Sequence, residues 1–143
     1  MLSNGDYYVL NGGITPSGFT NKFNSKENTI SISEGGNSCG YVNYNTVKFW
    51  SGGHNYTLTK LDLESIYLYQ RLKALENAIM ALRVGSGLPN IQKSRLEEFT
   101  VSYPKITEQK KIGALFAGLD KLITLHLYRD EQSEDKKLRR RKM

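Results

Sequence analysis

The sequence predicts an α+β protein in which a small, twisted, mixed β-sheet with flanking helices precedes one long C-terminal helix of the coiled-coil type. Residues 29–58 form several short β-branched and aromatic runs separated by Gly, Asn and Ser turns, which is typical of successive short strands. From residue 62 onward the apolar residues recur at helical spacing instead. Residues 107–134 contain no proline and repeat apolar residues every three or four positions, which predicts one long helix.

The strands are expected in the first sixty residues. Residues 7–10 are a short apolar run that ends at an Asn-Gly-Gly turn, and the polar segment 14–28 is expected to be a surface excursion between strands. In the run 29–33, Ile30 and Ile32 alternate with polar residues, as in a half-buried strand. The remaining strands of the sheet are expected at residues 40–44, 47–50 and 55–59.

Helices are expected after residue 61. Asp62 is a suitable N-cap with Glu64 in the first turn, and Gly85 is a suitable C-terminal stop. The apolar residues with helical spacing between them are Leu63, Ile66, Leu72, Leu75, Ile79 and Leu82. A glycine-proline loop, a helical turn at 93–98 and a final short strand at 99–103 are expected to follow.

The predicted long helix begins with Thr107 as its N-cap and ends near residue 134. About 28 residues at roughly 1.5 Å each form a rod of roughly 40 Å, which is more than a domain of this size needs. The apolar pattern favours pairing with a second helix over packing against the chain's own sheet. We call the repeating residues the pairing seam: Ile112, Leu115, Phe116, Leu119, Leu122, Ile123 and His126.

The net charge of +6 belongs mostly to the C-terminus. Residues 105–143 hold eleven of the 20 Lys and Arg residues against six of the 14 Asp and Glu residues, and the run 136–142 alone supplies six positive charges. We expect residues 136–143 to be a basic, disordered tail, with contact to nucleic acid or an acidic partner as the alternative. The remainder of the chain is nearly neutral, so its bulk charge does not argue for DNA binding.

Cysteine content and hydropathy indicate the compartment. Cys39 is the only cysteine, which excludes an internal disulfide and a cysteine-based zinc site, so we expect the reducing cytoplasm. No apolar run is long enough to span a membrane, and the N-terminus lacks the basic-then-apolar order of a signal peptide. We therefore expect no membrane partner.

The sequence contains no recognisable catalytic or cofactor motif. His54 and His126 are the only histidines, and the sequence identifies no nucleophile or base beside either one. The glycines match neither a phosphate-binding P-loop nor a dinucleotide-binding motif, and the side chains that a metal site needs are not clustered. We expect no catalytic residue, no metal and no cofactor.

Short amide, hydroxyl and lysine side chains are abundant in the expected loops. Such groups contact base edges and phosphates, although Asn, Ser and Gly are also ordinary turn formers. We expect the base-specific contacts within residues 15–26 and near residues 43–48. The candidate DNA-binding residues are Thr15, Ser17, Lys22, Lys26, Asn37, Ser38, Tyr41, Asn43, Lys48 and His54.

Three segments, in this order, resemble the specificity subunit of type I restriction-modification systems. They are residues 32–58 (ISEGGNSCGYVNY to GGHNYTL), residues 67–104 (YLYQRLKALENAIMALRVGSGLPNIQKSRLEEFTVSYP) and residues 106–126 (ITEQKKIGALFAGLDKLITLH). The resemblance implies a target recognition domain at 1–104 and a spacer and dimerisation helix at 105–135. It also implies that the subunit reads double-stranded DNA and is not itself an enzyme, while partner modification and restriction subunits carry out methylation and cleavage.

Two departures from that family bear on what this chain does. Complete subunits hold two recognition domains apart with antiparallel helices, whereas this chain has one domain, which also begins later than the family's domain does. We therefore expect a half-subunit, a truncated fragment or a homodimer, paired through the C-terminal helix with its copy or with another specificity half. Two other functions remain open: a fragment that only pairs its helix without reading DNA, and a small nuclease that uses Glu34 or Asp6.

Overall fold

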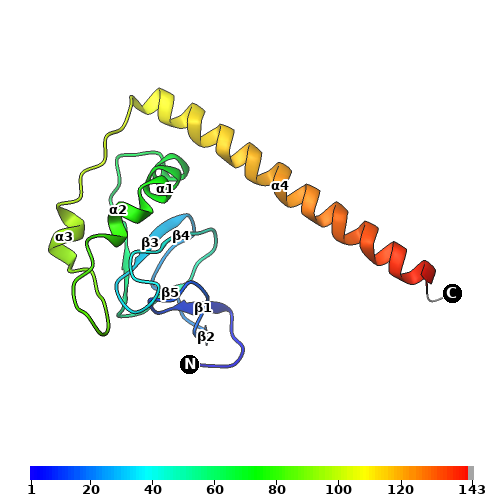
Figure 1. Cartoon of the computed structure of the whole chain (residues 1–143), viewed down its shortest axis with the longest axis horizontal. Helices are drawn as coiled ribbons and strands as arrows, with labels where there is room; N and C mark the ends of the chain where they lie inside the picture. Colours follow the sequence, from blue (N-terminus) through cyan, green and yellow to red (C-terminus); the bar gives the residue numbers. More distant parts are fainter. Residues whose placement is uncertain (142–143) are drawn as a thin grey trace.

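The structure is a computed structural model that describes the backbone of residues 1–141 and the side chains of residues 1–134. Within these residues a domain of short strands and helices is followed by one long projecting helix (Figure 1). The predicted α+β class is confirmed. The elements are β1 (Tyr7–Leu10), β2 (Gly18–Thr20), β3 (Thr29–Ser33), β4 (Val42–Asn45), β5 (Trp50–Ser51), β6 (Asn55–Thr57), α1 (Ser65–Ala74), α2 (Glu76–Met80), α3 (Lys93–Glu97) and α4 (Ile106–Arg141).

The strands form two three-stranded sheets rather than the single sheet that the sequence predicted. One sheet has the order β2-β1-β5 and is mixed, because β1 pairs antiparallel with β2 and parallel with β5. The other has the order β4-β3-β6 and is antiparallel throughout. The segment 14–28, expected to be only a surface excursion, supplies β2.

The core lies between the β4-β3-β6 sheet and the helices. Ile30 and Ile32 of β3 are each 1% exposed and pack in one cluster with α1 and α2. The opposite face of β3 is also buried, since Ser31 and Ser33 are completely inaccessible. The expectation of a half-buried strand is therefore wrong for β3. The other members of the buried core cluster are Cys39, Val42, Leu68, Leu72, Ile79 and Ile91.

Hydrogen bonds through Asn45 of β4 join the second face of β3 to the other sheet. The Asn45 amide donates to the backbone oxygen of Thr29 at 2.8 Å and to Ser31 Oγ at 3.0 Å. The Tyr8 hydroxyl of β1 donates to Asn45 Oδ1 at 2.8 Å. Because buried polar groups must find partners, this network fixes how the two sheets face each other.

The helical region from residue 62 differs from its prediction in three ways. The N-cap of α1 is Glu64 rather than Asp62, because the Glu64 carboxylate accepts hydrogen bonds from the N–H groups of Ile66 and Tyr67. The expected single helix is interrupted at Leu75 and ends at Met80, short of Gly85. Residues 99–103 form an irregular segment instead of a strand, although side chains from it pack against the core.

The long helix α4 packs against α1 only through its first turns and then projects away from the domain (Figure 1). Side chains from Gly118 to residue 134 are all exposed. The helical backbone continues past the predicted end near residue 134 to Arg141, since lysine and arginine favour helix and no proline interrupts it. Residues 142–143 of the expected basic tail lie outside the described residues. Within the described part of the chain, no helix has the length and apolarity to cross a membrane.

Candidate nucleic-acid interface

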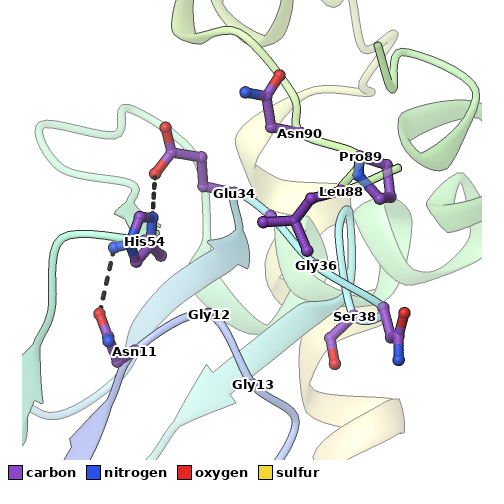
Figure 2. Close-up of a pocket in the computed structure, with 12 residues that line it drawn as sticks. Asn11, Gly12, Gly13, Glu34, Gly36, Ser38, His54, Leu88, Pro89 and Asn90 are labelled. Atoms are coloured by element: carbon purple, nitrogen blue, oxygen red, sulfur yellow. Dashed lines mark hydrogen bonds and ion pairs between the residues drawn. The ribbon is translucent and has the colours of Figure 1, made fainter. Parts of the chain in front are cut away.

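A hollow opens where four segments far apart in the sequence meet. It is lined by the turn after β1, by the turn after β3, by His54 and by the loop at residues 88–90, and its volume is about 440 Å³ (Figure 2). Three predicted DNA-binding residues, Asn37, Ser38 and His54, line it. The hollow therefore brings together predicted residues from two different loops.

Glu34 contributes the carboxylate of this hollow, and the sequence analysis considered it only as a nuclease candidate. Its Oε2 lies 3.5 Å from Nδ1 of His54, and its Oε1 accepts from the Tyr56 hydroxyl at 3.2 Å. Burial, and next the hydrogen bond to the Glu34 carboxylate, raise the pKa of Tyr56, so this hydroxyl keeps its proton at neutral pH. The Glu34 side chain is 27% exposed, which leaves it held in place and still accessible.

The backbone around Glu34 is fixed by three other segments. Its N–H donates to the His54 carbonyl at 3.0 Å, and its carbonyl accepts from the Ile91 N–H at 2.8 Å. The turn at Gly12 lies against His54, because a Cβ added to Gly12 would lie 2.7 Å from the His54 backbone oxygen. Because Gly12 also has a φ of +81°, only glycine fits there without strain. Figure 2 shows how His54 lies between Asn11 and Glu34, with the Asn11 Oδ1 accepting from the His54 N–H at 3.3 Å.

Three other predicted residues, Lys22, Lys26 and Lys48, form what we call the lysine cluster, at the opposite end of β1 from the hollow. Lys22 follows β2, whose Thr20 is paired with Tyr7 at the start of β1. The antiparallel bridge between Ser25 and Phe49 sets Lys26 opposite Lys48. All three lysines are exposed.

Phe23 stands within the lysine cluster. The Lys48 Nζ lies 4.8 Å from the centroid of the Phe23 ring, and Tyr7 packs against the same ring with 5.0 Å between centroids. A cation–π contact of this kind orders the lysine side chain and leaves its positive charge available to another partner. From Tyr7 beside this cluster to Asn11 at the hollow, the chain advances by four residues, about 13 Å of extended backbone at about 3.3 Å each.

The remaining predicted DNA-binding residues lie elsewhere. Thr15 and Ser17 are exposed between β1 and β2, and the Ser17 hydroxyl donates to the Val9 carbonyl at 3.2 Å. Tyr41 and Asn43 were expected to be accessible to DNA, within or beside the strand predicted at residues 40–44. Asn43 belongs to β4, but its Nδ2 is buried and without a hydrogen-bond partner, and Tyr41 lies under the Lys73 ammonium, 3.8 Å from the ring centroid.

The pairing seam divides between two faces of α4. Ile112 and Phe116 are half-buried in the turns that pack against α1. Leu115, Leu119 and Leu122 lie on another face, where they line a shallow groove of about 480 Å³ together with Ala114, Gly118, Lys121 and Leu125. Ile123 is 58% exposed, and His126 is also exposed and lies 3.4 Å from the Asp130 carboxylate through its Nε2.

Metal-binding chemistry has no visible basis in the part of the chain that the structure describes. Among these residues no three His, Cys, Asp or Glu side chains come together in a way that could hold a metal ion. Cys39 is fully buried, and burial raises the pKa of its thiol, which disfavours the reactive thiolate.

Comparisons with known proteins point to one family. The model of the type I restriction modification DNA specificity domain matches residues 2–132. A Mycoplasma pneumoniae protein named as a type I specificity subunit is 38% identical over 124 residues, which are 84% of this chain and 33% of that protein. A Mycoplasma genitalium protein with the same kind of name is 41% identical over 102 residues, which are 69% of this chain and 26% of that protein.

A solved structure is similar in its fold as well. The crystal structure of a type I restriction-modification system S subunit from M. genitalium superposes with a TM-score of 0.75 at 36% identity, and covers 83% of this chain and 33% of that one. The chain thus spans a third or less of the length of these relatives. Because the family model and the fold agree over most of its length, this chain belongs to the family of type I restriction modification DNA specificity domains.

Proposed function

We propose that this chain reads a DNA sequence as a recognition module of a type I restriction-modification enzyme, without catalysing a reaction itself. The observation that carries the proposal is the family match over residues 2–132, joined to the likeness with a solved S subunit. Partner modification and restriction subunits then supply methylation and cleavage, in the cytoplasm where the DNA is. The chain needs no cofactor or metal for this role.

Two surfaces divide the work of DNA binding. The lysine cluster contacts phosphates, because ammonium groups attract the backbone without regard to sequence. The hollow faces base edges, since Asn37, Ser38 and His54 offer donors and acceptors at its rim. Thr15 and Ser17, which are exposed between β1 and β2, supply further hydroxyl groups for contacts with DNA.

The exposed face of α4 binds a second helix. Leu115, Leu119 and Leu122 are 61%, 44% and 64% exposed, and apolar side chains in such a row favour burial against a partner. That partner is the helix of another specificity half or of a second copy of this chain. A rigid pair of helices holds two recognition modules at a fixed distance, as a target read in two separated halves requires.

A binding selection on randomised duplex DNA tests the proposal, performed with this chain alone and with the chain assembled with its modification subunit. We expect recovery of a defined short half-site from the assembly. Stable assembly that retains no preferred sequence would contradict DNA reading and would support a module that only pairs helices. Cleavage of DNA by the purified chain with Mg²⁺, lost in Glu34→Gln, would instead support the nuclease alternative.

A further inference from the structure

We infer that Glu34 reads the amino group of one cytosine in the DNA target, held in position by its contacts with Tyr56 and His54. This inference rests on the proposed function and deepens it, since it names the base that the hollow takes. It names a base contact, whereas the lysine cluster contacts the DNA backbone.

The first step is the sign of the charge in the hollow. Among the lining residues, all of which lie in the described part of the chain, Glu34 is the one carboxylate, and none is a lysine or an arginine. A carboxylate repels phosphate and costs binding energy wherever it faces the DNA backbone. A carboxylate in a DNA-binding surface is therefore best placed opposite a hydrogen-bond donor on a base.

The second step is which base carries that donor. In the major groove only cytosine N4 and adenine N6 are donor groups. Adenine also presents its N7 acceptor beside N6. When one carboxylate oxygen accepts from N6, the N7 lone pair faces the other carboxylate oxygen and the two repel each other. Cytosine presents its amino group without a neighbouring acceptor of its own, so an ionised carboxylate discriminates in favour of cytosine.

The third step is whether Glu34 has capacity left for a base. An ionised carboxylate accepts about four hydrogen bonds. The Tyr56 hydroxyl approaches Oε1 at 3.2 Å but lies closer, at 2.9 Å, to the Ile91 carbonyl, and His54 approaches only Oε2. Both carboxylate oxygens therefore keep free lone pairs. Because Tyr56, His54 and the fixed backbone already restrict the Glu34 side chain, binding a base costs little conformational entropy.

The fourth step is the distance between the two surfaces. The hollow and the lysine cluster are about 13 Å apart along β1, close to the roughly 12 Å width of the major groove. A duplex that offers a base edge to Glu34 can therefore bring a phosphate strand bordering the groove to the lysines.

The test compares three assemblies of the chain with its modification subunit: wild type, Glu34→Gln and Glu98→Gln. The Gln variant at 34 keeps the shape and can still accept from Tyr56, but it prefers adenine to cytosine. Glu98 is exposed at the end of α3 and does not line the hollow, so its variant controls for the loss of one negative charge. Randomised DNA is selected with each assembly, and thermal unfolding checks that each chain is folded.

We expect one position of the half-site to require cytosine with wild type and with Glu98→Gln. With Glu34→Gln, the preference for cytosine at that position alone should fall roughly 10-fold, with adenine gained. An unchanged preference, or a half-site without a specified cytosine, overturns the inference while the proposed function stands. Failure of the wild-type assembly to select any sequence overturns the proposed function itself.

A second measurement changes the base instead of the side chain. The wild-type assembly is titrated with its selected duplex in which the critical cytosine is replaced by pyrimidin-2-one, which lacks the amino group. We expect affinity to fall roughly 10-fold, and Glu34→Gln to show no further loss from the same replacement. Equal losses in both proteins would mean that another residue contacts the amino group, and the assignment to Glu34 would be wrong.

Discussion

The side chain of Gln109 in α4 accepts a hydrogen bond from the backbone N–H of Glu64, at 3.1 Å. Its amide also donates to the Pro104 carbonyl at 2.8 Å, and the residue is only 2% exposed. One buried side chain thus ties the start of the long helix both to the N-terminus of α1 and to the segment that leads into α4. This contact sets the direction in which α4 leaves the domain.

Replacing Gln109 by alanine should destabilise the chain by about 2–4 kcal/mol. The change leaves two part-buried backbone groups without the Gln109 partner, and an unsatisfied buried group costs about 1–3 kcal/mol. Urea unfolding followed by circular dichroism measures the effect. Gln92→Ala is the control, because Gln92 is exposed and makes no capping hydrogen bond, and its unfolding free energy should change by less than about 0.5 kcal/mol. Similar values for the two variants would contradict the structural role of Gln109.

The two glycines of α4 should respond in opposite ways to alanine. A Cβ on Gly113 would collide with the Glu64 carboxylate that caps α1, whereas a Cβ on Gly118 meets no neighbouring atom. Gly118→Ala should stabilise the helix by up to about 1 kcal/mol, the difference in helix propensity. Gly113→Ala should lose the cap, worth about 0.5–2 kcal/mol, and should be the less stable of the two in chemical unfolding. Equal stabilisation in both variants would show that α4 does not pack against Glu64.

Local sequence patterns predicted β1, β3, β4, β6 and the long helix because their signals lie within a few residues. The alternation of Ile30 and Ile32 identified β3, and the apolar repeat identified α4. The interruption at Leu75 had no such signal, since the apolar spacing continues through it and no glycine or proline is nearby. There the Glu76 carboxylate accepts from the Val42 N–H at 2.9 Å, a tertiary contact that local spacing does not reveal.

The sequence predicted individual residues of the candidate site, but it did not predict which of them lie together. Turn composition identified Asn37, Ser38 and His54 as polar and accessible, which is what the hollow shows. The place of Glu34 in the hollow was not predicted, because its neighbours Tyr56 and His54 approach it only when β6 pairs with β3. For Asn43 the sequence predicted the strand, but it did not predict that the register with Ser31 leaves the Nδ2 atom buried.

The exposed groove of α4 gives a prediction for pairing. Leu122→Gln should weaken self-association, or association with another specificity half, at least 10-fold, because a polar group would be buried in the helix interface. Its unfolding free energy as a monomer should barely change, since Leu122 is 64% exposed. Sedimentation velocity over a range of concentrations measures the association.

Leu127→Gln is the matched control for that variant. Leu127 is 59% exposed on the same helix but does not line the groove. It should associate like the wild-type chain. Equal weakening by the two substitutions would mean that the groove is not the pairing surface.

The lysine cluster gives the last prediction, which concerns salt. Lys22→Ala and Lys48→Ala should each weaken DNA binding by the assembly, about equally for cognate and random duplexes, since phosphate contacts carry no sequence information. Each should also lower the slope of log affinity against log salt by about 0.9, the value for one released counterion on duplex DNA. Lys93→Ala is the control, because Lys93 is exposed and pairs with Glu97 on α3, away from the cluster. Fluorescence anisotropy at several salt concentrations measures the slopes, and a slope unchanged in both cluster variants would remove these lysines from the DNA interface.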